Sequence, residues 1–235
     1  MITTKKIVIS GTYCTGKTTL SLALAKATGI PATHALTMRE ILPQLYPGKS
    51  LRQCSPAELI SLGLRRFQER IQAESTLPQG FISDGCPLQE WLYGSTRLRT
   101  GAYPDEYPWQ MKLQKIWHYQ RYQDFQKLLD GFGGLAQQYT KSQYDLFFHL
   151  PVEFDFVADG HRPTSERFRE ASEKRLVQLY TELGITPVHL SGSIEERLVQ
   201  ALDLLQIDPV FPIDYCIRHA GLQRRAHFDS IQLET

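Results

Sequence analysis

The sequence predicts an α/β fold of three layers, in which helices cover both faces of a mainly parallel sheet. Two observations support this class: short β-branched runs alternate with segments of helical periodicity, and the first run leads through a glycine-rich turn into a helix. The length of 235 residues suits one domain with an insertion. We expect this domain to span residues 1–206, with residues 207–235 as a C-terminal extension that packs on it.

The composition is that of a globular protein, with 42% hydrophobic and 22% charged residues. A net charge of +1 provides no general attraction to nucleic acid or anionic membranes, so we expect neither as a partner. No run approaches 18 apolar residues and no signal-peptide pattern is present, which indicates a cytoplasmic protein. The four cysteines include no C-x-x-C pair, which favours a reducing compartment. Cys216, His219 and His227 lack a second cysteine, so zinc is disfavoured there.

The first element pair predicts a phosphate site. Residues 6–10 predict a buried strand, and residues 17–28 predict a helix that ends at Gly29. The turn between them matches G-x-x-x-x-G-K-[ST], whose backbone N–H groups and helix N-terminus hold phosphates; Lys17 is expected to reach the β and γ phosphates and Thr18 to bind magnesium. A chance glycine turn is the alternative, which the flanking strand and helix disfavour. The predicted nucleotide-binding residues are Gly11, Thr12, Tyr13, Cys14, Thr15, Gly16, Lys17, Thr18 and Thr19.

The next elements predict a carboxylate for the same site. Residues 55–58, SPAE, open a helix that ends by Gly80. Residues 81–84, FISD, predict a buried strand whose last residue, Asp84, falls where strand ends meet a ligand crevice. A turn-forming aspartate before Gly85 is the alternative, but beside a phosphate loop we favour Asp84 as a catalytic carboxylate and magnesium ligand. One face of the helix carries Ile60, Leu64, Phe67 and Ile71.

The later segments continue the alternation of helices and strands. Residues 107–129 predict a long helix, which the following DGFGG breaks, and residues 144–150 predict another buried strand. Residues 187–190 predict a further strand, and a capping box begins a helix at Ser193. From Ile207 on, prolines argue against a further core helix, so this extension would wrap the domain or cap the site.

Residues 151–169 predict a mobile lid, because they combine prolines, a glycine and three arginines after a buried strand. Arg162 and Arg167 are the predicted catalytic cations of this lid, whereas Arg169 is expected to serve structure. The alternative is a solvated loop that leads into an amphipathic helix.

Three function classes compete for this pattern. Regulatory GTPases read guanine through N-K-x-D, and this chain contains no asparagine. Ring-forming motor ATPases usually place an aspartate and a glutamate together at the end of the strand that corresponds to residues 81–84. This chain has Asp84 there, but Gly85 in place of the glutamate, so a hydrolysing motor is disfavoured. A small-molecule kinase needs a phosphate loop, a carboxylate, an acceptor pocket and a basic lid, and each has a candidate here.

The acceptor pocket is expected in the segments that follow the second and third strands. Residues 37–40 and 86–97 supply basic, acidic and aromatic side chains, and an aromatic ring there could stack on a base-like ring. For the aromatic pair, core filling is an equally open alternative. The predicted acceptor-binding residues are Arg39, Glu90, Trp91, Tyr93 and Arg97.

Four stretches resemble a known group of proteins: GTYCTGKTT, FISDGCPLQEWLYG, YDLFFHLP and DGHRPTSERFRE. The group is the ribosylnicotinamide kinase-like, AAA-domain branch of P-loop ATP-binding proteins within the nucleoside and nucleotide kinase fold. The likeness covers about residues 5–206, and the last stretch resembles the group's Asp-Gly-x-Arg-Pro lid. The resemblance implies a P-loop NTPase fold, ATP with Mg²⁺, and phosphoryl transfer to a hydroxyl of a nucleoside-like acceptor.

The chain departs from this group after Asp84. Many relatives have Asp-Arg there, whereas this chain has Gly85, so Arg39 or Arg97 would have to replace the missing arginine. The acceptor's identity therefore stays open. The sequence predicts a small-molecule kinase that binds ATP, Mg²⁺ and a small acceptor. The alternative is a nucleotide-dependent ATPase or regulatory module. A homodimer is a possible oligomeric state.

Overall fold

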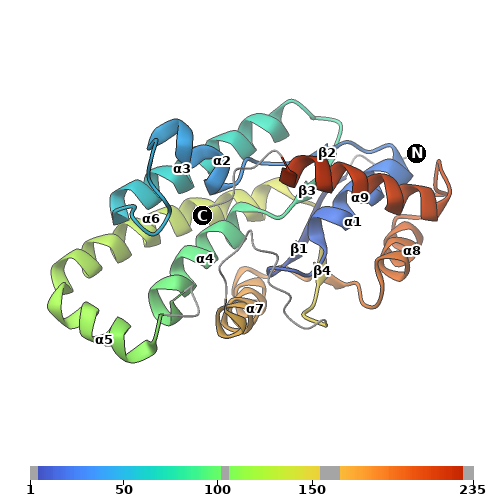
Figure 1. Cartoon of the computed structure of the whole chain (residues 1–235). Helices are drawn as coiled ribbons and strands as arrows, with labels where there is room; N and C mark the ends of the chain where they lie inside the picture. Colours follow the sequence, from blue (N-terminus) through green and yellow to red (C-terminus); the bar gives the residue numbers. More distant parts are fainter. Residues whose placement is uncertain (1–4, 102–105, 154–164, 230–235) are drawn as a thin grey trace.

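The structure, a computed structural model, describes residues 5–101, 106–153 and 165–229 (Figure 1). This part of the chain contains a five-stranded sheet in the order β2-β3-β1-β4-β5, and all neighbouring strands are parallel. The predicted α/β class with a mainly parallel sheet is therefore confirmed. The strands are β1 (Lys6–Gly11), β2 (Ala32–Thr33), β3 (Phe81–Asp84), β4 (Leu146–Leu150) and β5 (Val188–His189). The helices are α1 (Lys17–Thr28), α2 (Met38–Leu45), α3 (Pro56–Ser75), α4 (Pro87–Thr100), α5 (Pro108–Trp117), α6 (Tyr119–Gln143), α7 (Glu166–Leu183), α8 (Ile194–Leu205) and α9 (Ile213–Asp229).

Alternation along the central strand β1 divides the core into two clusters. Ile7 and Ile9 pack with side chains of α1, α8 and α9, whereas Val8 packs with side chains of α4, α6 and α7. All three β1 side chains are fully buried. Figure 1 shows α1, α8 and α9 on one side of the sheet and α4 and α6 on the other. This two-sided burial explains why the strand is apolar without a polar alternation.

Local signals set the ends of several helices as predicted. Ser55 and Ser193 each accept a hydrogen bond from the third residue of the helix, whose glutamate bonds back to the serine N–H, so both capping boxes are present. Helix α1 ends at Thr28 and is followed by the cap residue Gly29, which adopts φ 75°. These contacts lie within four residues of one another, which is why the sequence pattern revealed them.

The predicted break at DGFGG is wrong, because α6 runs through it to Gln143. A side chain at Gly133 would place its Cβ 2.5 Å from the indole of Trp91 in α4. The glycine thus permits close packing of two helices instead of ending one. The predicted helix over residues 107–129 is also divided, since α5 ends at Trp117 and α6 begins at Tyr119.

The apolar face expected on α3 packs inward only in part. Ile60 and Phe67 pack against the core cluster of α4 and α6, and the Phe67 ring meets Phe132 and Tyr139. Leu64 and Ile71 are 45% and 37% exposed, while Arg70 and Glu74 are buried. The buried charges are tolerated because they pair with each other and with further partners in the core. Residue type alone therefore identified only part of the buried face of this helix.

The expectation that no core helix follows Ile207 is wrong as well. Helix α9 begins at Ile213, directly after Pro212, and its Cys216 and Ala220 are fully buried in the cluster that contains α1. The prolines precede the helix, where a missing N–H and a fixed φ cause no disruption. None of the helices in the described residues is both long and apolar enough to cross a membrane.

Candidate functional site

The turn between β1 and α1 has the geometry of a phosphate-binding loop. Gly11 adopts φ 140°, and a Cβ at this position would lie 2.6 Å from the Leu150 carbonyl oxygen of β4. Gly16 precedes α1 with φ 91°. Within the loop the Thr15 hydroxyl donates to the Thr12 carbonyl at 3.0 Å, and Lys17 Nζ donates to the same carbonyl. The lysine ammonium is therefore held over the loop by an internal acceptor.

The start of α1 is suited to an anion. Its first turn carries Lys17, Thr18 and Thr19 and no acidic residue. Unpaired N–H groups and the positive end of the helix dipole favour negative charge at such a terminus. The Thr12 hydroxyl in the loop is buried without a hydrogen-bond partner among the described residues. A bound phosphate oxygen would satisfy a donor of this kind.

Asp84 lies beside the helix start, as its place at the end of β3 predicts. The parallel register sets Asp84 opposite Ile9, two residues before Gly11. The Thr18 hydroxyl donates to Asp84 Oδ2 at 2.7 Å. The two predicted magnesium ligands are thus in contact, and hydroxyl and carboxylate oxygens are donors that Mg²⁺ prefers.

His34 is a neighbour of Asp84 that the sequence reading missed. It follows β2, and its Nδ1 lies 3.8 Å from Asp84 Oδ2. Burial lowers the pKa of the His34 imidazole, and this outweighs the opposing effect of Asp84, while His227 lowers the pKa further. These influences together favour the neutral imidazole.

Two side chains hold the phosphate loop from outside and were also missed. The buried Arg197 of α8 donates to the Thr15 carbonyl at 2.6 Å and pairs with Glu153 at 2.7 Å. Gln89 of α4 donates through Nε2 to the Gly11 carbonyl. No local pattern marks these residues, because their partners lie 182 and 78 residues away along the chain.

Tyr93 is the predicted acceptor residue that the structure places against the loop. Its ring stacks on Tyr13 with centroids 4.2 Å apart, and its hydroxyl donates to the Gly11 carbonyl at 3.3 Å. Phe168, at the start of α7, lies 5.8 Å from the Tyr13 ring. The three rings form one aromatic cluster beside the loop.

Two other predicted acceptor residues lie in the core. Trp91 is 6% exposed and packs against Gly133, which favours the core-filling alternative for this ring. Glu90 is buried and pairs with Arg70 at 2.7 Å and with Arg66 at 2.8 Å. Burial would raise the pKa of Glu90, but the two arginines outweigh it and lower the pKa. The placement of Glu90 therefore favours a structural role.

Arg70 also accounts for the local chemistry around Gly85. Its guanidinium donates to the carbonyls of Asp84 and Gly85 at 3.3 and 3.1 Å and to the Ser83 hydroxyl at 2.6 Å. Gly85 adopts φ 79°, which disfavours any other residue there. A guanidinium is thus present behind Asp84, but it is buried and supports the turn from within.

The remaining predicted cations are spread around the site. Arg39 lies in the first turn of α2 and Arg97 in the last turn of α4, and both are partly buried. Arg167 donates to the carbonyls of Thr100 and Glu106 at 2.6 and 2.8 Å, which joins α7 to the end of α4. Arg162 lies outside the described residues.

Arg169 pairs with its neighbour in α7, as its expected structural role implies. It is buried and donates to Glu166 at 2.6 Å. The pair lies three residues apart on one face of the helix, where such side chains meet.

The parallel sheet, the glycine loop before α1 and the Thr18–Asp84 contact define a P-loop protein of the kinase-like α/β fold. Residues 6–197 match the family model described as AAA domain, so the chain belongs to that family. Among curated proteins, no sequence matches this chain.

Solved structures share the fold at low sequence identity. A structure of NadR protein in complex with NR has a TM-score of 0.56 and 13% identity, and covers 89% of this chain and 54% of its own. A structure of NadR in complex with NAD and AMP-PNP has a TM-score of 0.54 and 14% sequence identity, and the match covers 87% of this chain and 49% of NadR. The chain therefore spans about half the length of NadR. Deoxyadenosine kinase from M.mycoides, with products dCMP and a flexible dCDP bound, has a TM-score of 0.51 and 11% sequence identity. The match covers 86% of this chain and 98% of the kinase.

Proposed function

We propose that the protein transfers the terminal phosphoryl group of ATP to a hydroxyl of a small, nucleoside-like metabolite. Thr18 and Asp84 would hold Mg²⁺, which supplies positive charge to the phosphates when bound. Lys17 would leave the Thr12 carbonyl and neutralise charge on the migrating group. Asp84 would orient the acceptor hydroxyl and take its proton as the new P–O bond forms and the bond to ADP breaks.

The contact between Thr18 and Asp84 is the observation that carries this proposal. It joins the helix start after the phosphate loop to the carboxylate of Asp84. The residue after Asp84 is Gly85 and not a glutamate. An adjacent glutamate is what a hydrolysing motor would use to polarise water. The site as built therefore suits transfer to a positioned acceptor better than hydrolysis.

Tyr93, Arg39 and Arg97 are the residues that we propose for the acceptor side. Tyr93 offers an aromatic face next to the loop, and the arginines offer charge from α2 and α4. NR and dCMP, bound in the similar structures, are nucleoside-like, which supports an acceptor of that class. Closure of the lid by Arg162 and Arg167 remains part of this proposal.

A nucleotide-dependent ATPase or regulatory module is the second candidate, because the family is described as an AAA domain. It predicts fast hydrolysis without any acceptor. A cytoplasmic location, the absence of nucleic-acid partners and a homodimer stay predictions under either function.

The test is to incubate the protein with Mg²⁺, γ-labelled ATP and pools of nucleosides, sugars and cofactor precursors. We expect label on a metabolite and at least a hundredfold loss of transfer in Lys17→Ala, because the ammonium is the main point charge on the phosphates. Lys26→Ala, in the last turn of the same helix, is the matched control and should keep full activity. Label found only as free phosphate would favour the ATPase instead.

A further inference from the structure

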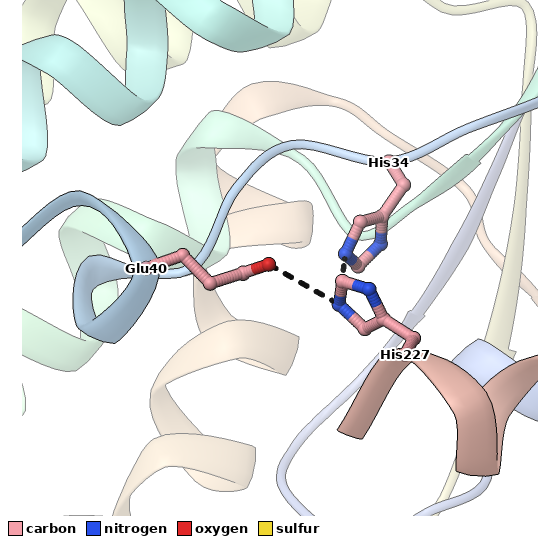
Figure 2. A group of neighbouring side chains, drawn as sticks. All are labelled: His34, Glu40 and His227. Atoms are coloured by element: carbon pink, nitrogen blue, oxygen red, sulfur yellow. Dashed lines mark hydrogen bonds and ion pairs between the residues drawn. The ribbon is translucent and has the colours of Figure 1, made fainter. Parts of the chain in front are cut away.

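We propose that His34, Glu40 and His227 form a binding site for a zinc-type divalent metal ion, which fastens α9 beside the carboxyl edge of the sheet. Figure 2 shows the three side chains converging from separate segments. His34 follows β2, Glu40 lies in the first turn of α2, and His227 lies near the end of α9. Its ligands are different residues from the proposed magnesium ligands Thr18 and Asp84, although His34 faces Asp84, and the proposal does not depend on the proposed kinase function.

The distances between the ligand atoms are close to those of a metal site. The two Nε2 atoms of His34 and His227 are 3.0 Å apart, and His227 Nε2 is 3.5 Å from Glu40 Oε1. One ligand atom from each residue lies within 4.8 Å of the others. Tetrahedral zinc with bonds of about 2.0–2.1 Å separates its ligand atoms by about 3.3 Å. A small adjustment of the Glu40 and His34 side chains would therefore close the site.

Neighbouring groups orient one of the ligands and face another. Glu40 accepts the Thr37 N–H through Oε2 at 2.7 Å in the capping box of α2, which leaves Oε1 toward His227. His34 turns Nδ1 toward Asp84, whose Oδ2 is 3.8 Å away and would have to move closer to form a hydrogen bond, and Nε2 toward His227. A carboxylate on the far nitrogen of a ligating histidine is the usual outer partner in protein metal sites. The site thus has both its ligands and a candidate outer shell.

The chemistry of the donor set selects the kind of ion. Two imidazole nitrogens and one carboxylate oxygen suit zinc and its neighbours, whereas Mg²⁺ prefers oxygen ligands alone. Three protein ligands leave a fourth position for water or for an oxygen of another ligand. The side chains of His34 and His227 are 37% and 30% exposed, so an ion can enter from solvent.

Bound metal would link the end of α9 to the active-site side of the molecule. Earlier along the same helix, Cys216 and Ala220 pack into the cluster that contains α1. His34 in turn faces Asp84. The ion would therefore hold α9 at a second point, next to the proposed catalytic carboxylate. Without metal, one ring nitrogen can donate to the other at 3.0 Å, which is the competing account of the contact.

The test uses tag-free full-length protein, free of nucleotide and stripped with a chelator. Co²⁺ is titrated while its visible absorption is recorded, and Zn²⁺ binding is measured by calorimetry. We expect one ion per chain, a spectrum without thiolate-to-metal charge transfer, and no displacement by excess Mg²⁺. Zn²⁺ should also raise the melting temperature and slow amide exchange in residues 213–229.

Variants identify the ligands. His34→Ala, Glu40→Gln and His227→Ala should each weaken Co²⁺ binding by at least the 10–100-fold or so typical of losing an outer-shell partner. His219→Ala is the matched control on the same helix and should bind Co²⁺ like the wild type. Glu40→Gln retains an acceptor for the Thr37 N–H, so it should fold even if a histidine variant does not.

Three results would overturn the proposal. One is thiolate charge transfer, which would assign the ion to a cysteine such as Cys14. Another is equal Co²⁺ affinity in Glu40→Gln, His227→Ala and the wild type. The third is an absence of stoichiometric binding at neutral pH, which would leave the contact as a histidine pair.

Discussion

At the scale of single residues, Thr18 and Asp84 come from positions 66 apart in the chain and form one polar unit. The register of β1 against β3 brings them together, since Asp84 is opposite Ile9. A parallel sheet places the carboxyl ends of its strands at one edge, so a loop after one strand meets the last residue of the next. The chemistry at this edge can be tested one side chain at a time.

Asp84→Asn keeps the shape of the side chain and removes its charge. The Thr18 hydroxyl can still donate to the amide oxygen, so we expect ATP to bind within a fewfold of the wild type. Phosphoryl transfer should fall by about 10²–10⁴-fold, the usual contribution of a positioned base. Steady-state kinetics with calorimetry of ATP binding would measure both effects.

Asp145→Asn is the control for that change, because Asp145 precedes β4 at the opposite edge of the sheet and accepts the Lys6 N–H at 2.8 Å. It should leave the rate unchanged. An unaltered rate in Asp84→Asn would make Asp84 a turn residue only.

Cys14 adopts φ 59°, a left-handed conformation that is costly for a residue with a Cβ. Such strain is about 1–2 kcal/mol, and the greater unfolded-state entropy of glycine offsets about 0.4–1 kcal/mol of the relief. Cys14→Gly should therefore raise the free energy of unfolding by about 0.5–1 kcal/mol. Cys14→Val, which adds β-branching, should lower it. Urea denaturation of both variants measures the difference, and a more stable valine variant would contradict the strain argument.

At the scale of elements, α3 is held to the sheet by charge as well as by apolar contact. Arg70 is 1% exposed and donates to Glu90, to Ser83 and to two carbonyls of the turn after β3. Glu74, one turn later, accepts hydrogen bonds from the hydroxyls of Tyr139 and Tyr144. The helix therefore connects β3, α4 and α6 through one buried polar network.

Arg70→Met should lower the free energy of unfolding by about 3–5 kcal/mol, because it leaves Glu90 buried with one cation fewer and leaves carbonyls unpaired. Arg65→Met is the control on the same helix. It removes only a partly exposed pair with Glu69, which is worth about 0–1 kcal/mol. Chemical denaturation at neutral pH measures the free energy of unfolding of both variants. Equal losses would mean that the buried polar network adds no stability beyond packing.

The pH dependence of Arg70→Met has a definite sign. Burial raises the pKa of Glu90, but Arg66 and Arg70 overcome it, so the pKa in the folded protein lies below its ordinary value. The ionised glutamate therefore stabilises the fold above about pH 4.3, and this contribution disappears as the pH falls through the lowered pKa. The stability gap between wild type and variant should narrow in acid.

At the scale of the whole molecule, α9 completes the layer that covers α1. Ala220 of α9 is fully buried, with 0% relative exposure, in the cluster that also contains side chains of α1 and α8. Ala220→Asp should lower stability by about 3 kcal/mol or more, because it buries a charge without a partner. Leu222→Asp, at a 65% exposed position of the same helix, should change it by at most about 0.5 kcal/mol. Thermal and urea unfolding compare them; a neutral Ala220→Asp would mean that α9 does not pack in solution.

The sequence by itself determined the features that depend on neighbours in the chain. Short patterns of two to five residues predict the glycine loop, the capping boxes at Ser55 and Ser193, and the buried strands. Backbone strain, capping hydrogen bonds and strand burial all depend on residues at that distance along the chain. The position of Asp84 at a strand end belongs to this group as well.

Only the tertiary structure decided which distant side chains meet. Arg197 reaches the loop from 182 residues away, and His34 meets His227 across 193. Gly133 reads as a helix breaker until the Trp91 indole lies against it. The charge of Arg70 can be buried in α3 because Glu90 of α4 supplies its partner. In each case the free energy that fixes the residue comes from a partner on another element, and a one-dimensional pattern contains no information about that partner.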